Sequence, residues 1–404
     1  MRNIQFFNIN DKTLNKKKIY LFGNGDIATK TYNKIRFKYI VHGIFDNKKT
    51  LHGSVTKDKL KIINPNTIKK LKRNIHIIIT TSSYYDVSKQ LKNIGLVFGE
   101  NYSVTSLLKD QSTIDEIQNY EAEMYFTSGT FKKNKKKTGG GIYFLKLNKN
   151  NWYTKKIVSG PCYSLINYNK GYAYTSSEKG LVTCDRNFKT KKKFFIDPLF
   201  RAHGVSFSKK FESFFIACAN LDKILMIEKS LKKIVCEFKI SQLKNNDEIS
   251  KYHCNDCFVH NNSLYVSVFS ISGNYKHDSY DGGIIEFDIP SGKKIGVIKS
   301  NLTMPHNILL INNKFHILDS LNGNLLTNNF TVQGTFPGFS RGLDFNEKYY
   351  FIGQSRNRQF SKQRNIMNNV SSDTGVIIFD NYNKVSRFLN VNNEISEIHS
   401  ILVK

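Results

Sequence analysis

A short strand signal recurs six times between residue 160 and the last residues of the sequence. Each unit begins an apolar strand at a polar or turn-like residue, and all but the sixth continue through a tight polar turn into a second apolar strand. The starts are separated by 41, 52, 51, 35 and 58 residues, and such a recurring unit indicates a repeat architecture. Because almost no helical periodicity lies between the units, the pattern predicts a six-bladed β-propeller. The starts read CYSLI (162–166), HGVSF (203–207), NDCFV (255–259), HNILL (306–310), RGLDF (341–345) and HSILV (399–403).

The incomplete sixth unit predicts how the ring closes. Residues 122–158 contain three strand-like pieces without an inner strand, whereas residues 397–404 form an inner strand without its outer three. Pairing the two completes one blade and leaves no exposed sheet edges at the junction. We therefore predict a propeller over residues 122–404 that is closed by the C-terminal strand.

When the six units are aligned by their turns, one position at the strand starts holds mostly histidine, arginine and asparagine, which are common in binding sites. In a propeller the innermost strand of each blade directs its first residues to one axial channel, so these residues are expected to meet there. A concavity with convergent polar groups is the default binding-site hypothesis. The aligned position holds Cys162 or Tyr163, then His203, Asn255, His306, Arg341 and His399. With two neighbours added, the predicted ligand-binding residues are His203, Asn255, Asp256, His306, Arg341, Arg356 and His399.

The C-terminal part resembles an uncharacterised family of bacterial β-propeller proteins with strictosidine-synthase- or gluconolactonase-like architecture. The resemblance rests on HGVSF (203–207), Asn255-Asp256, MPHNILL (304–310) with Leu318-Asp319-Ser320, FPGFSRGLDF (336–345) and GQSRNR (353–358). It spans about 200 residues and implies the propeller fold. It implies no activity, because the family has none that can be transferred.

Three functions are compatible with the aligned residues. The first is binding of an anionic sugar or sugar phosphate, with the histidines as hydrogen-bond donors and Arg341, with Arg356, as a clamp for a carboxylate or phosphate. The second is a metal-dependent lactonase or other hydrolase, in which His203, His306 and His399, with Asn255 and Asp256, hold a divalent cation. The third is a non-catalytic platform for protein interactions, in which the same residues only fill the channel.

The first hundred residues predict an α/β domain. A strand at 18–22 is followed by Gly23-Asn24-Gly25-Asp26-Ile27-Ala28, a helix to about Arg36, and a strand ending at Asp46, which is the βαβ order of dinucleotide-binding folds. A helix near Asn66–Lys72, a strand at 75–80 and a helix at 84–94 complete a small doubly wound, Rossmann-like domain over residues 1–105. The polar stretch 106–121 is expected to be a linker. The candidate cofactor-binding residues are Gly23, Asn24, Gly25, Asp46 and Ser82.

This segment resembles the small Rossmann-like domains attached to sugar-modifying enzymes of bacterial surface polysaccharide pathways. The resemblance rests on IYLFGNGDIA (19–28), GIFDN (43–47) and IIITTSSYYDV (77–87). It implies a nucleotide or nucleotide-sugar cofactor and a role in surface glycan metabolism. The alternative is a purely structural domain, because Asp26 at the start of the helix would repel a pyrophosphate.

Composition restricts the partners. The formal net charge is +29, but 51 of the 61 basic residues are lysines, which is typical of a solvated surface, so we expect no nucleic-acid partner. The N-terminal residues contain no apolar segment of a signal peptide, and no apolar run approaches the length of a membrane span. Six cysteines, mostly within apolar strand patterns, are expected to be buried free thiols in the cytoplasm. The sequence predicts a small-molecule ligand and leaves the oligomeric state open.

Overall fold

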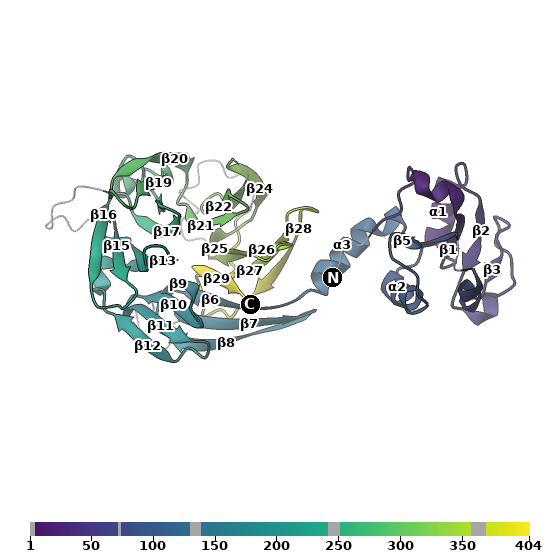
Figure 1. Ribbon diagram of the computed structural model, residues 1–404, viewed down its shortest axis with the longest axis horizontal. Helices are drawn as coiled ribbons and strands as arrows, with labels where there is room; N and C mark the ends of the chain where they lie inside the picture. The colour runs from purple at the N-terminus through teal and green to yellow at the C-terminus, as the bar shows by residue number, and fades with distance from the viewer. Residues whose placement is uncertain (1–4, 72–73, 130–138, 241–250, 328, 357–368) are drawn as a thin grey trace. The chain divides into compact units, whose positions relative to one another are not determined.

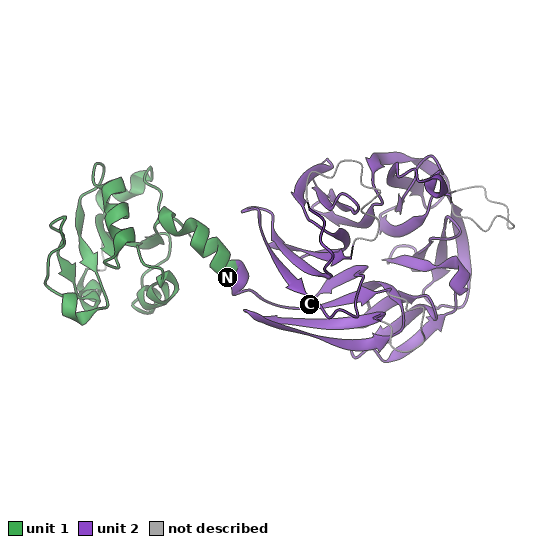
Figure 2. Ribbon diagram, turned by 180° about the vertical axis from the view of Figure 1, so that it is seen from behind, with its two compact units in different colours: residues 1–116 green, residues 117–404 purple. Residues whose placement is uncertain are grey.

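The computed structural model describes the chain except for residues 1–4, 72–73, 130–138, 241–250, 328 and 357–368. Within the described residues the chain divides into two compact units, Met1–Glu116 and Ile117–Lys404 (Figure 2). The stretch expected to be a linker contains the 3-10 helix η4 (Ser106–Leu108) and helix α3 (Lys109–Gln118). No helix in this described part is both long enough and apolar enough to span a membrane.

The first unit contains a parallel five-stranded sheet. Its strand order is β3-β2-β1-β4-β5, and every pairing in it is parallel. Strand β4, which lies between β1 and β5, is buried along its whole length, as expected for a parallel strand covered on both faces. The strands are β1 (Lys18–Phe22), β2 (Val41–Phe45), β3 (Ile62–Ile63), β4 (Ile75–Ile79) and β5 (Tyr102–Val104), with helices α1 (Asp26–Ile35) and α2 (Tyr84–Asn93).

The prediction of a doubly wound, Rossmann-like domain is met only in part, because the parallel sheet has few α-helices. The segment expected to be a helix near Asn66–Lys72 forms a 3-10 helix, η3 (Pro65–Lys70), and Lys72 lies outside the described residues. Asn64 accepts a hydrogen bond from the backbone N–H of Asn66 and so caps this short turn. Another 3-10 helix, η2 (Lys49–Leu51), lies between β2 and β3.

The second unit is a six-bladed β-propeller, as predicted. Six four-stranded antiparallel sheets surround a central axis, with one end strand of each sheet innermost (Figure 1). The inner strands are β9 (Cys162–Tyr168), β13 (Ala202–Ser208), β17 (Cys254–His260), β21 (His306–Ile311), β25 (Phe339–Phe345) and β29 (Ser400–Val403), which define blades 1 to 6. The remaining strands of blades 1 to 3 are β10 (Gly171–Ser176), β11 (Gly180–Asp185), β12 (Thr190–Phe194), β14 (Ser213–Cys218), β15 (Lys223–Glu228), β16 (Ile234–Lys239), β18 (Ser263–Val268), β19 (Gly282–Asp288) and β20 (Lys294–Leu302). Those of blades 4 to 6 are β22 (Lys314–Asp319), β23 (Asn324–Thr327), β24 (Thr331–Thr335), β26 (Tyr349–Ser355), β27 (Gly375–Asp380), β28 (Val385–Asn390), β6 (Glu121–Ser128), β7 (Gly141–Asn148) and β8 (Asn151–Ser159).

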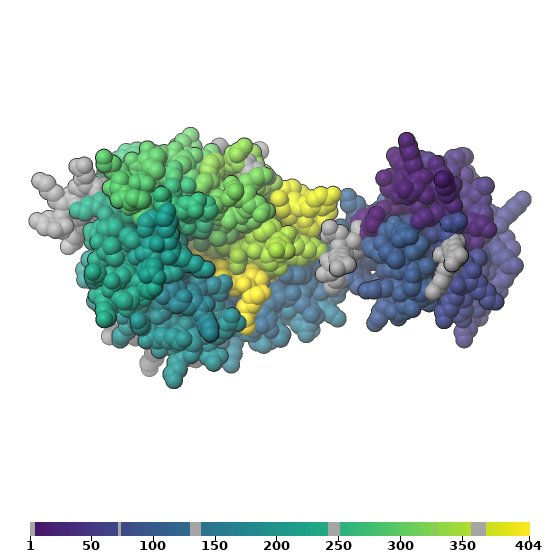
Figure 3. Space-filling model, in the orientation of Figure 1, coloured from purple at the N-terminus to yellow at the C-terminus, as the bar shows by residue number. Residues whose placement is uncertain are grey.

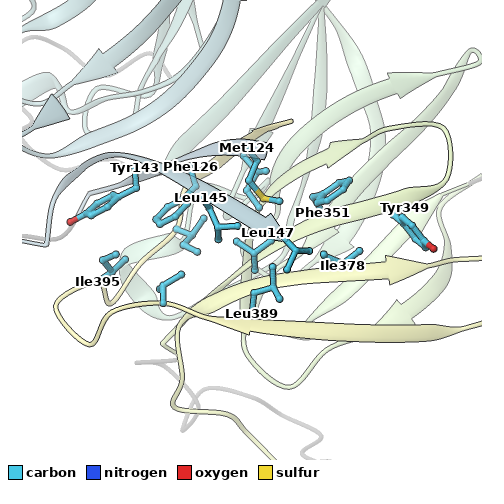
Figure 4. Packing of buried hydrophobic residues seen from close by; sticks show 14 of the residues in the cluster. Met124, Phe126, Tyr143, Leu145, Leu147, Tyr349, Phe351, Ile378, Leu389 and Ile395 are labelled. Carbon is cyan, nitrogen blue, oxygen red and sulfur yellow. The ribbon is translucent and has the colours of Figure 1, made fainter. Parts of the chain in front are cut away.

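The C-terminal strand closes the ring. Strand β29 pairs antiparallel with β6, with Ser400 opposite Thr127 and Val403 opposite Met124, so blade 6 combines both ends of this unit. The C-terminal residues therefore lie among residues from the middle of the chain (Figure 3). Met124, Leu145 and other apolar residues of blade 6 pack against Phe351 and Leu389 of blade 5, with Ile395 from the segment between the blades (Figure 4).

Small polar side chains tie neighbouring blades together at three junctions. Thr127 donates to the carbonyl of Tyr163 at 2.9 Å, and Thr175 donates to the carbonyl of His203. Ser355, on β26, makes two such bonds to Ile398, donating to its carbonyl at 3.1 Å and accepting from its N–H at 3.0 Å. These bonds satisfy backbone groups that are not paired within their own sheet, and they hold the strand starts in place around the axis.

We expect Ser355→Ala to lower the free energy of unfolding of the propeller by about 2 to 4 kcal/mol, because a buried N–H and a buried C=O each lose their partner. Trp152 is the single tryptophan and lies in blade 6, so its fluorescence during urea denaturation reports on this unit alone. The matched control is Ser386→Ala, at an exposed position of β28 in blade 5, the blade that also contains Ser355. Equal denaturation midpoints for the two variants would show that the bonds to Ile398 do not support the closure.

Candidate functional site

A cavity of ≈ 320 Å³ lies where the inner strands begin. Four of the seven predicted ligand-binding residues line it, namely His203, His306, Arg341 and Arg356. The described residues that line it are Arg201, His203, His253, Phe269, Tyr275, Met304, His306, Phe339, Arg341 and Arg356.

The sequence interpretation missed a second ring of lining residues. Arg201, His253, Met304 and Phe339 each stand two residues before the aligned position of their blade. Three of them, Arg201, His253 and Met304, share a left-handed backbone, with φ of 52°, 53° and 54°. All three lie just before their inner strands, in left-handed and not extended backbone, so strand alternation does not place them, and only their common offset from the aligned position could have found them.

Arg341 is held in the wall of the cavity by contacts on two sides. Its guanidinium carbon lies 4.7 Å from the centroid of the Phe339 ring, and its Nη1 lies 3.9 Å from Oε2 of Glu397. The residue is only 7% exposed. A buried guanidinium with an aromatic face behind it and a carboxylate beside it has little freedom to move, so its charge is fixed at the cavity.

His399 lies behind the cavity and does not line it. Its Nε2 donates to Oε2 of Glu397 at 2.8 Å, since the carboxylate can only accept. Glu397 again stands two residues before the aligned position of its blade. The ring of His399 contacts two other rings edge-on, with centroids 4.9 Å from that of Tyr163 and 5.2 Å from that of His203. His399 therefore supports the cavity wall through its neighbours.

His203 has a ring nitrogen without a hydrogen-bond partner. Its ring stacks on Tyr163 at 4.3 Å and is 5% exposed, yet none of the described residues bonds to its Nε2. Tyr163 stands at the aligned position of blade 1. A buried polar atom without a partner costs free energy unless something in the cavity satisfies it.

The four histidines in and behind the cavity are uncharged at neutral pH. Burial lowers the pKa of His203 and His306 well below 6.5, and nearby positive charges lower it further. Burial, with Arg201 and Lys276, lowers the pKa of His253 to about 3, and burial with Arg341 lowers that of His399 to about 4. The fixed positive charges at the cavity are therefore guanidinium groups.

Asn255 and Asp256 are not brought to this cavity. Asn255 is buried, donates from Nδ2 to the carbonyl of Pro305 at 2.9 Å and accepts from Ser267, which are structural bonds. Asp256 lines a second cavity, of ≈ 340 Å³, formed by later residues of the inner strands. There it accepts a hydrogen bond from the N–H of Ile308 at 3.2 Å, and burial raises its pKa to about 7.

The separation of Asp256 from the histidines bears on the metal hypothesis. A divalent cation needs at least three protein ligands that converge on one point. Within the described ranges, no group of three or more His, Cys, Asp or Glu side chains is arranged to hold an ion. His203, His306 and His399 thus remain near one another without forming a ligand set.

In the first unit, the predicted cofactor-binding residues lie on three segments, and a hydrogen bond joins two of them, Asn24 and Asp46. Oδ2 of Asp46 accepts from the N–H of Asn24 and Oδ1 accepts from that of Lys48, both at 2.8 Å. Gly23 has φ of 102°, and a Cβ at this position would lie 2.8 Å from Cβ of Thr81. Gly25 caps α1 without a side-chain bond, and Ser82 is exposed. A cavity of ≈ 620 Å³ in this unit, beside α2 and β5, is lined by none of the five residues.

Comparison with protein families gives two matches. A model described as a domain of unknown function, DUF4915, matches residues 152–403, and one described as C2185-like, N-terminal, matches residues 15–98. The first match confirms the prediction of an uncharacterised propeller family. The second names neither a nucleotide nor a sugar-modifying enzyme, so the resemblance to Rossmann-like domains of such enzymes is not supported. A search of curated proteins finds no match to the sequence.

Comparison with solved structures concerns the fold alone. A chain of the nidogen/laminin complex is similar with a TM-score of 0.50 and 10% identity, over 70% of this chain and 98% of that chain. A protein of unknown function from Bacteroides caccae has a TM-score of 0.47 and 13% identity, over 70% and 98%. The calcium-binding protein regucalcin from Agrobacterium tumefaciens has a TM-score of 0.41 and 11% identity, over 58% and 75%.

We expect His253→Asn to reduce the loss of stability in acid. The unfolded imidazole takes up a proton near pH 6.5, whereas the folded one stays neutral down to about pH 3, so the stability that it contributes above pH 6.5 is lost as the pH falls. The loss amounts to at most about 1.4 kcal/mol per pH unit for this one group. Asn tolerates the left-handed backbone at this position.

Urea denaturation at pH 7 and pH 5.5, followed by Trp152 fluorescence, measures the effect. Asp256 works in the opposite direction, because its raised pKa contributes stability in acid that is lost as the pH rises towards about 7. The comparison is therefore made between variants, with His277→Asn as the control at an exposed histidine. An unchanged acid loss in His253→Asn would mean that the folded protein protonates this imidazole readily.

Proposed function

Because the chain belongs to the DUF4915 family, whose description assigns no function, we propose a function from the cavity itself. The propeller binds a small anionic ligand, of the sugar-acid or sugar-phosphate type, in the cavity where its inner strands begin. The observation that carries the proposal is the set of three arginines, Arg201, Arg341 and Arg356, in the lining of one cavity of ≈ 320 Å³.

The distribution of basic residues supports an anion. The sequence has only ten arginines among its 61 basic residues, and three of them line this cavity, whereas no lysine is among the described residues of its lining. Glu397 is the nearby carboxylate, and it already lies against Arg341 and His399. Guanidinium groups match the geometry of carboxylates and phosphates through paired N–H donors, so this concentration favours recognition of an oxyanion.

The rest of the lining supports a compact polar body attached to the anion. Phe269, Tyr275 and Phe339 contribute aromatic rings, and the neutral imidazoles of His203 and His306 contribute hydrogen-bonding atoms. A volume of ≈ 320 Å³ is at the small end of the range for ligand pockets, which run from about 300 to 1,000 Å³. A single sugar ring with one acidic group fits these properties.

The other functions have less support. A metal-dependent hydrolase needs converging ligands, and Asp256 and His306 line different cavities. In the first unit both oxygens of Asp46, the acid expected to bind a ribose, already accept backbone hydrogen bonds, and the cavity beside α2 is lined by none of the predicted cofactor-binding residues. We therefore propose neither. The predicted role in glycan metabolism stays a prediction, as does the interaction platform.

We expect glucuronate and glucose 6-phosphate to bind the purified protein and uncharged glucose not to bind, as measured by isothermal titration calorimetry. Arg356→Ala and Arg201→Gly should each weaken binding by about 10-fold or more, the loss of one charge-assisted hydrogen bond. Both positions tolerate the change, because Arg356 is exposed and glycine suits the left-handed backbone of residue 201.

Arg186→Ala removes an exposed arginine outside the cavity and is the matched control, expected to bind like the unaltered protein. Equal weakening in all three variants would indicate attraction by the overall charge of +29 and would contradict a specific site. Stabilisation by zinc, manganese or calcium without any response to the anions would support the metal-dependent alternative instead.

A further inference from the structure

His306 presents a hydrogen-bond acceptor to the cavity. Its Nδ1 lies 2.9 Å from the carbonyl oxygen of Met304 and 2.8 Å from Oγ of Ser320. A carbonyl oxygen can only accept, so Nδ1 carries the hydrogen and donates it. The ring is neutral, because burial and the charge of Arg341 hold the pKa of His306 well below its usual range. A neutral imidazole has one N–H, so Nε2 has a lone pair.

This acceptor requires a donor on the ligand. The side chain of His306 lines the cavity, and the described residues supply no hydrogen-bond partner for its Nε2. Water can donate to it while the cavity is empty of ligand, but a ligand that displaces the water must replace that donor or lose affinity. Deprotonated carboxylate and phosphate oxygens only accept, whereas a hydroxyl group can donate. The ligand therefore needs a hydroxyl group in addition to its anionic group.

The charge of the site favours two negative charges. Three guanidinium groups line the cavity, and Glu397 supplies one carboxylate, with Oε2 at 3.9 Å from Nη1 of Arg341. Among the described residues the surplus is therefore two positive charges. A carboxylate neutralises one of them, whereas a phosphate monoester carries about −1.5 to −2 at neutral pH. A phosphate monoester can therefore neutralise the second positive charge of this site, whereas a single carboxylate cannot.

His203 adds a donor for the same group. Its buried Nε2 has no partner among the described residues, and its neutral ring can carry the hydrogen on either nitrogen. Arg201, two residues earlier on the chain, lines the same cavity. Together they offer a phosphoryl group one neutral and one charged donor from blade 2, in addition to Arg341 from blade 5.

We propose that the ligand is a phosphate monoester of a hydroxyl-bearing compound, a sugar or polyol phosphate. The inference rests on the proposed function, the binding of an anion in this cavity. The phosphoryl group contacts Arg201, Arg341 and His203, and a ligand hydroxyl donates to Nε2 of His306. The acidic group and the hydroxyl are thus recognised by different residues.

Four probes test the proposal on the unaltered protein by calorimetry. Glucose 6-phosphate has the phosphate and hydroxyls, glucuronate has a carboxylate on the same ring, methyl phosphate has no hydroxyl, and glucose has no charge. We expect glucose 6-phosphate to bind at least about 10-fold more tightly than glucuronate and than methyl phosphate. Glucuronate binding as tightly as glucose 6-phosphate would overturn the inference and leave the anion site standing. Anions binding no better than glucose would overturn the proposed function itself.

Two substitutions separate recognition of the hydroxyl from support of the fold. The Asn amide in His306→Asn can reach the position of Nδ1 and keep the bond to Met304, but it has no atom at the position of Nε2. In His306→Gln an amide oxygen can occupy the position of Nε2. We expect His306→Asn to weaken glucose 6-phosphate about 10-fold without changing the affinity for methyl phosphate, and His306→Gln to retain the affinity for both.

Equal weakening of both probes in His306→Asn would mean that His306 only supports the wall, which contradicts its contact with a hydroxyl. Thermal unfolding of each variant shows whether it folds. If the variants do not fold, the four-probe series still decides, because it uses the unaltered protein.

Discussion

The pairing of β29 with β6 is the interaction on which the rest of the propeller depends. It joins residues about 275 positions apart, as in the pair Ser400 and Thr127, and converts an open row of sheets into a ring. A ring without sheet edges at its junction has a defined axis, and only then do the starts of the six inner strands face one another. The same segment supplies Glu397 and His399, so closure also places the counter-charge beside Arg341.

The sequence was sufficient to predict the six inner strands, but it was not sufficient to predict which residues at successive levels of the channel line the cavity. Apolar strands after polar turns identify the six inner strands, and the structure places His203, His306 and Arg341 in one cavity. Alignment by turns finds one layer of the channel only, so it missed Arg201 and His253 one layer above. It also placed Asp256 with the histidines. Asp256 directly follows the aligned position of its blade and lines a different cavity, among later residues of the inner strands. Several inner strands share a register shift at this point, so simple strand alternation does not give the face on which each side chain lies.

The first unit shows that a sequence motif can predict the backbone conformation correctly without predicting whether a ligand binds there. Gly23 is required because the loop after β1 passes close to Thr81 with a positive φ, whether or not a phosphate binds there. Asp46 stands at the end of the strand where a ribose-binding acid is expected, yet its carboxylate closes its own loop by accepting from Asn24 and Lys48. The spacing of the glycines and the acid reflects the geometry of a junction between a strand and a helix. That spacing is the same whether the acid binds a ribose or accepts backbone hydrogen bonds from its own loop.

The positions of the charged residues in this protein say more about what it recognises than the size of its net charge does. The formal charge of +29 comes mainly from 51 lysines, whose flexible ammonium groups stay hydrated at the surface and are screened by salt. None of the lysines in the described part of the chain lines the cavity, whereas three of the ten arginines do. Arg341, at 7% exposure, is largely withdrawn from solvent, and an interaction with a ligand charge there is weakened far less by water and ions than one at the surface. A few fixed guanidinium groups therefore determine what the cavity recognises, while the many surface lysines contribute only a diffuse field.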